Sequence, residues 1–86
     1  MPKALITRYH GCTNTKPSKI SASDSDKNRV FVSYDHELDV DKNHAIAART
    51  LCLKMRWPGE LVGGSLPNGD MVWVFAESTD RIFVPV

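Results

Sequence analysis

The stretch "DVDKNHAIAARTLCLKMRWPG", residues 39–59, predicts the helix around which the rest of the chain is arranged. Asp39 or Asp41 can accept hydrogen bonds from the unpaired backbone N–H groups at a helix start. Pro58 and Gly59 stop helices, so we expect this one to end at Trp57. No other segment has a comparable helical pattern. The remaining regular structure must therefore come from strands.

The predicted helix carries apolar residues on two opposite sides. The broader group recurs at about 100° per residue and should face a sheet; it comprises His44, Ala47, Ala48, Leu51, Cys52 and Met55. The smaller group contains Ile46, Leu53 and Trp57, with Arg49 close by. One helix on one sheet cannot bury both sides, and aromatic residues beside an arginine are typical of interface hot spots. We therefore predict a protein-binding surface formed by Ile46, Arg49, Leu53 and Trp57.

Segments with strand character flank the helix. Three precede it and two follow it, at residues 3–9, 18–23, 29–34, 60–65 and 70–76. Turn residues at 24–28 and the Pro-Asn-Gly of residues 67–69 favour hairpins, and Gly63 and Gly64 indicate a bulge or a close backbone approach. The predicted fold is α+β: a mostly antiparallel sheet of about five strands, with one helix packed on one face. We expect residues 1–86 to form one domain, in which residues 82–84 either add a further edge strand or mediate association.

Charge and composition exclude several classes of function. The 11 Lys and Arg residues nearly balance the 10 Asp and Glu residues, and a net charge of +1 provides no strong field for general nucleic-acid binding. Cys12 and Cys52 lack the paired spacing of zinc sites or disulfide frameworks, which favours a reducing compartment. No apolar run approaches the roughly 18 residues of a membrane helix or the core of a signal peptide. We expect a cytoplasmic protein without membrane contact.

Catalysis and metal binding are both disfavoured by the pattern of reactive residues. His10 and Cys12 share one face of an extended segment, but no nucleophile elbow or phosphate-binding glycine loop is present. His10, Cys12, His36 and His44 also lack the spacing of known metal sites. We interpret His44 as a partly buried residue with a backbone partner. The sequence thus predicts no enzymatic activity, no metal and no cofactor.

The loop around residues 9–19 provides an alternative binding surface. Basic side chains and neutral hydrogen-bond donors of the kind that contact phosphates occur here together: Arg8, Tyr9, Asn14, Lys16 and Lys19. The same polar groups can instead satisfy the backbone of the loop itself. Nucleic-acid binding through this loop therefore stays open as a second hypothesis.

The longer sequence pattern resembles that of a known group of proteins. The stretches "RYHGCTNTKPSKISASD", "YDHELD" and "KMRWPGELVGGSLPNGDMVWVF" follow one another within residues 8–75. In this pattern the chain resembles small bacterial proteins of uncharacterised function that are found on phages, plasmids and other mobile elements. That group is associated with Gly-Pro-Thr-Asn followed by Arg-Gly-Ser-Arg in the first loop. Here Cys12 takes the proline place, Lys16 and Pro17 replace Arg-Gly, and Lys19 keeps a positive charge. The resemblance implies a mobile-element setting and no particular reaction.

These inferences lead to two hypotheses about function. The first is a small non-enzymatic protein–protein interaction module or modulator, whose partner is another protein or a second copy of the chain. In a mobile-element setting, an inhibitor of a host defence system is one form of such a module. The second is a nucleic-acid-binding module that uses the basic loop of residues 9–19.

Overall fold

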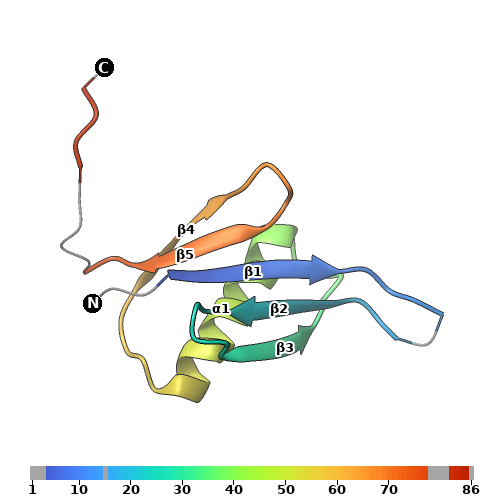
Figure 1. Ribbon diagram of the computed structural model, residues 1–86. Helices are drawn as coiled ribbons and strands as arrows, with labels where there is room; N and C mark the ends of the chain where they lie inside the picture. Colours follow the sequence, from blue (N-terminus) through green and yellow to red (C-terminus); the bar gives the residue numbers. More distant parts are fainter. Residues whose placement is uncertain (1–3, 15, 78–81, 86) are drawn as a thin grey trace.

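An antiparallel sheet carries one helix on one face in this computed structural model, which describes residues 4–14, 16–77 and 82–85 (Figure 1). The α+β fold and the order of strands and helix predicted from the sequence are confirmed. The elements are β1 (Ala4–His10), β2 (Lys19–Ser23), β3 (Arg29–Ser33), α1 (Val40–Met55), β4 (Leu61–Ser65) and β5 (Met71–Phe75).

The strands lie in the order β3-β2-β1-β5-β4, so that the first strand of the chain is the central one. β1, β2 and β3 follow one another as hairpins, and α1 then carries the chain across to the other side of β1. The predicted turns are present. Asp24 accepts the backbone N–H of Asp26 and Asn28 at 3.0 Å in one turn, and Gly69 takes a positive φ of 93° in the other. Local turn chemistry therefore fixes both hairpins.

The helix begins and ends at recognisable caps. The Asp39 carboxylate accepts the backbone N–H of Lys42 at 2.8 Å, as expected for an N-terminal cap. Arg56 adopts the left-handed conformation, and its N–H bonds back to the carbonyls of Cys52 and Leu53. The helix therefore ends at Met55. The prediction that it extends to Trp57 is wrong by two residues, because Arg56 adopts the left-handed conformation. This helix is neither long nor apolar enough to span a membrane.

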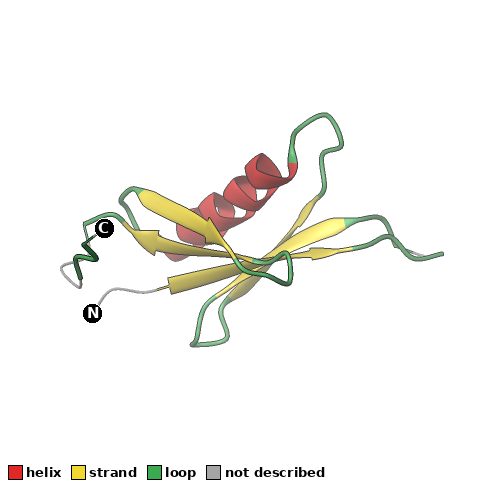
Figure 2. Ribbon diagram, turned by 90° about the horizontal axis from the view of Figure 1, so that it is seen from above, coloured by secondary structure: helices red, strands yellow, loops and turns green. Residues whose placement is uncertain are grey.

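The core lies between the helix and three of the strands. α1 lies on one face of the sheet (Figure 2), where it packs on β1, β2 and β3 and scarcely reaches β4 and β5. Small side chains bring helix and sheet close together around larger ones; the buried apolar residues are Leu5, Ile20, Ala22, Ala47, Ala48, Leu51, Cys52 and Met71. Because the helix lies to one side, Met71 is buried on β5, whereas Leu61, Trp73 and Phe75 on the helix-facing side of β4 and β5 are only partly buried.

The opposite face of the sheet is open in the part of the chain that the structure describes, and residues 82–85 add no strand to it. Ile6, Val62 and Val74 lie on this face and are exposed. Residues 82–85 form no strand, so the first of the two alternatives for residues 82–84, a further edge strand, is wrong. Pro85 removes a backbone donor from that short segment, which is consistent with its lack of strand pairing.

Candidate functional site

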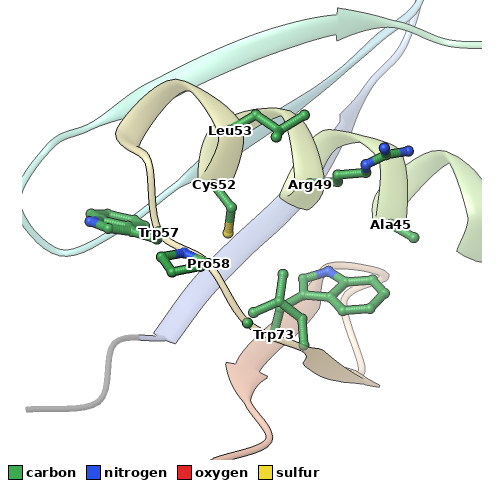
Figure 3. Close-up of a pocket in the computed structure, with 9 residues that line it drawn as sticks. Ala45, Arg49, Cys52, Leu53, Trp57, Pro58 and Trp73 are labelled. Carbon is green, nitrogen blue, oxygen red and sulfur yellow. The ribbon is translucent and has the colours of Figure 1, made fainter.

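A groove of about 380 Å³ lies where the helix covers β4 and β5 only in part (Figure 3). Its lining comes from the second half of α1, the chain that follows it, and the helix-facing sides of β4 and β5. The lining residues are Ala45, Arg49, Cys52, Leu53, Trp57, Pro58, Gly59, Leu61 and Trp73. Both tryptophans of the chain are therefore in the groove, although 15 residues separate them in the sequence.

The end of the helix places Trp57. After the left-handed turn at Arg56, the N–H of Trp57 bonds to the carbonyl of Cys52 at 2.9 Å, which holds the indole beside the last helical turn. Pro58 and Gly59 then carry the chain down to β4. In Figure 3 the sulfur of Cys52 points from the helix into the space between Pro58 and Trp73.

Trp73 is held on the other side of the groove by its neighbours in the sheet. A Cβ added to Gly63 would lie 2.6 Å from the indole ring, so the ring lies against β4 because this position has no side chain. The Trp73 Nε1 donates a hydrogen bond to Thr7 Oγ1 at 3.0 Å, which fixes the orientation of the ring. The predicted close approach is confirmed at Gly63. The β4–β5 pairing runs without an extra residue, so the alternative of a bulge is excluded.

The structure brings together most of the predicted protein-binding surface. Arg49, Leu53 and Trp57 line the groove, whereas Ile46 does not. Leu53 is 67 % exposed, and Trp57 is partly buried because it also packs against the core. Sequence analysis missed Trp73. Strand alternation indicates that its side chain faces the helix layer, but not that the helix buries it only in part.

The groove has the chemistry of a binding surface. Its lining is mostly apolar and aromatic, and Arg49 adds an exposed positive charge at the helix side. Burial raises the pKa of the Cys52 thiol, which keeps the sulfur protonated and a poor nucleophile at neutral pH. The groove can therefore hold an apolar side chain and pair with a carboxylate.

The residues of the alternative, basic surface are divided between different sides of the molecule. Arg8 forms an ion pair with Asp70 at 2.9 Å, so its charge is compensated. Tyr9 lies on the helix side of the sheet, where its hydroxyl donates to Ser18 at 3.2 Å. Asn14 and Lys16 are exposed in the loop, and the Lys19 ammonium lies 4.6 Å from the centre of the Phe31 ring on the open face.

The residues considered for metal binding or catalysis are also separated. Within residues 4–14, 16–77 and 82–85, no three His, Cys, Asp or Glu side chains are placed to hold a metal ion. His10 bonds to Ser21 at 2.9 Å, and Cys12 is exposed in the loop. The interpretation of His44 as partly buried was wrong, because its side chain is fully buried. Its ring bonds to the side chain of Thr7 at 2.6 Å, and a backbone hydrogen bond with Thr7 also acts on its pKa. Tight helix–sheet packing encloses it more completely than its place at the helix start suggested.

Comparisons of the chain with protein-family models, curated proteins and solved structures give no match. The mobile-element setting therefore stays a prediction from the sequence.

Proposed function

We propose that this protein is a protein–protein interaction module that holds an extended, apolar segment of another protein in the groove between α1 and β4. One observation carries the proposal: two tryptophans from distant parts of the chain line an apolar groove that the helix leaves uncovered. Tryptophan in a pocket is the residue type that most often dominates binding energy at protein interfaces. In a mobile-element setting, such a module would act as a modulator, for example as an inhibitor of a host defence system.

The exposed edge strand β4 indicates that the bound segment of the partner is extended. Among the described residues β4 pairs only with β5, so its other side offers backbone N–H and C=O groups to an extended chain. Leu61 belongs to this edge strand and also lines the groove. A segment that pairs with β4 would therefore place alternate side chains over Leu61 and the indoles. Arg49 favours a partner with a carboxylate close to its apolar residue.

The test compares two apolar-to-acidic substitutions on the same helix. Leu53→Glu puts a charge into the groove, whereas Ile46→Glu puts one on a helical residue that is 42 % exposed and does not line the groove. Tagged wild-type protein and both variants are used to capture partners from a nuclease-treated bacterial lysate. The partner is then purified, and its affinity is measured by calorimetry. We expect Leu53→Glu to weaken binding by at least about tenfold and Ile46→Glu to leave it unchanged.

Two outcomes would overturn the proposal. A partner bound equally by wild type and Leu53→Glu would place the interaction elsewhere on the molecule. Self-association of the purified chain that Leu53→Glu abolishes, measured by light scattering, would make the groove an interface between two copies instead of a site for another protein.

Nucleic-acid binding has a specific observation in its favour and remains the second candidate. Phe31 is 52 % exposed on the open face, with Lys19 over its ring and the His10 ring 5.8 Å away. An exposed aromatic ring beside a cation is the arrangement on which proteins stack single-stranded bases. If this function is correct, combined Lys16→Glu and Lys19→Glu substitutions should abolish binding to an oligonucleotide. Leu53→Glu should leave that binding unchanged.

A further inference from the structure

The open face of the sheet is divided into an apolar half and a polar half. At the end of the sheet where β1 begins, this face is apolar in two adjacent rows that run across β4, β5 and β1. The rows are Val62, Val74 and Ala4, and Gly64, Val72 and Ile6. We call these six residues the apolar patch. The solvated face of an antiparallel sheet is ordinarily polar, so a patch of this kind needs an explanation.

The polar half of the face limits how another molecule can cover it. Its two rows are Arg8, Ser21 and Phe31, and His10, Lys19 and Ser33. Arg29 adds an exposed positive charge at the edge of the sheet. Stacking the whole faces of two copies would cover Lys19 and Arg29 with apolar groups or with other cations, and a charge buried without a partner is costly. A contact between two copies on this face must therefore use the apolar patch and leave the polar half in water.

A second exposed apolar group belongs to the same chain. Ile82, Phe83 and Val84 follow one another outside the sheet, and Figure 1 shows residues 82–85, in dark red, away from the strands. We call these three residues the apolar segment. The Phe83 side chain is 88 % exposed. Scattered exposed apolar residues are ordinary, whereas three in succession indicate a surface that another group covers.

The patch and the segment are complementary in shape as well as in polarity. Gly64 leaves an indentation in the patch beside Val62 and Val72, because a Cβ added there would meet no heavy atom within 4 Å. A glycine on the face of a strand allows another group to approach closely. An aromatic ring fits such an indentation, and Phe83 is the aromatic residue of the segment.

A second copy of the chain presents the patch in a suitable direction for the segment. After β5 the N–H of Ala76 bonds to the carbonyl of Glu60 at 2.7 Å, so the chain still runs away from the patch at that point. The segment could reach its own patch only if the chain reversed, whereas a copy related by two-fold symmetry needs no reversal. Covering patch and segment in both copies removes on the order of 1,000 Å² from water, which is about the area that a specific interface requires.

We propose that two copies of this chain form a symmetric dimer in which the apolar segment of each lies on the apolar patch of the other, with Phe83 over Gly64. The groove of the proposed function stays free, because it opens on the helix side of the sheet and the patch lies on the opposite face. A dimer would therefore present two grooves and could hold two segments of a partner at once. The dimer does not depend on the proposed function, and each can fail without the other.

Analytical ultracentrifugation of the full chain, from about 1 to about 500 µM, measures the dimer directly. We expect a dissociation constant of about 10–100 µM, as for a small interface. Val62→Glu puts a charge into the patch and Phe83→Glu puts one into the segment, and each should weaken the dimer by at least about tenfold. Phe83 lies outside every strand and helix, so a loss in that variant is not caused by unfolding.

Phe31→Glu is the matched control on the same face. Phe31 is 52 % exposed and Val62 51 %, but Phe31 lies in the polar half. Phe31→Glu should leave the dissociation constant unchanged, and so should Leu53→Glu, whose charge is in the groove.

A mixture of the two disrupted variants tests the reciprocal arrangement. Val62→Glu keeps an intact segment and Phe83→Glu keeps an intact patch. One of the two contacts can therefore form in the mixed dimer, whereas neither can form in a dimer of one variant. The mixture should associate more tightly than either variant alone.

Four outcomes would overturn the proposal. A chain that stays monomeric over the whole concentration range has no such interface; if Phe83→Glu then shifts the Val62 methyl signals in NMR spectra, the segment covers its own patch. A dimer that Phe83→Glu leaves unchanged would be formed by patch on patch alone. Loss of the dimer in Phe31→Glu would mean that the whole faces stack. Loss in Leu53→Glu would place the interface in the groove, and only this outcome would also contradict the proposed function.

Discussion

Gly63 lies against the indole of Trp73, and the groove depends on this contact. A Cβ at this position would meet the ring at 2.6 Å, closer than real carbon contacts allow. We predict that Gly63→Ala displaces Trp73 and lowers the free energy of unfolding by about 1–3 kcal/mol. Chemical denaturation measures the loss, and tryptophan fluorescence reports the displaced ring.

Gly64 is the matched control in the same strand. A Cβ there would have no heavy atom within 4 Å, so Gly64→Ala should change the unfolding free energy by no more than about 0.5 kcal/mol. Equal losses from the two substitutions would show that glycine flexibility in β4, and not the contact with Trp73, is what matters.

His44 makes the stability of the fold depend on pH. Burial lowers its pKa below the ordinary value of 6.5, against the opposing charges of Asp41 and Asp70. Below pH 6.5 the unfolded chain therefore binds more protons at this histidine than the folded protein does. We predict that this contribution to stability is complete above pH 6.5 and declines as the pH falls from there toward the lowered pKa.

Denaturation of the wild type at several pH values measures this decline. His10→Gln and His36→Gln, at side chains that are not buried, should retain it. His44→Gln should remove it. An NMR titration of His44 in the wild type gives its pKa directly, so this test does not depend on whether His44→Gln folds. A pKa at or above 6.5 would contradict the prediction.

The residue that caps the end of the helix, Arg56, has a backbone conformation that arginine does not favour. Arg56 has φ 60° and ψ 43°, in the left-handed region where side chains other than glycine are strained. We predict that Arg56→Gly stabilises the protein by about 1 kcal/mol, because glycine is the preferred residue at this cap. Lys54→Gly, two residues earlier within α1, should destabilise by about the same amount. Thermal unfolding compares the two variants. Melting temperatures that shift in the same direction in both would contradict the prediction that glycine is favoured at the cap alone.

At the scale of the whole molecule, Trp57 contributes both to folding and to the proposed binding, whereas Leu53 contributes to the proposed binding alone. Trp57 packs against the core as well as lining the groove, whereas Leu53 is largely exposed. We predict that Trp57→Ala lowers the unfolding free energy by about 1–3 kcal/mol, while Leu53→Glu changes it by less than about 0.5 kcal/mol. Denaturation of both variants checks this, and an equal loss would mean that Leu53 contributes to folding as well.

The elements of this fold could be predicted because their signals are local. Asp39 caps a helix, the turns at residues 24–28 and 66–69 form hairpins, and alternation places Leu5 and Thr7 on one side of a strand. Each signal depends on neighbours along the chain, whose spacing follows from backbone geometry alone. The α+β class and the strand order along the chain followed from these signals.

Both candidate sites depend instead on contacts between distant residues. Thr7 holds the Trp73 indole, and Ile6, Val62 and Val74 form one patch, only because β5 pairs with both β1 and β4. The groove exists because the helix packs over β1, β2 and β3, where small side chains allow close packing, and leaves Trp73 only partly buried. Such packing balances contributions from the entire core, so no short stretch of residues encodes it.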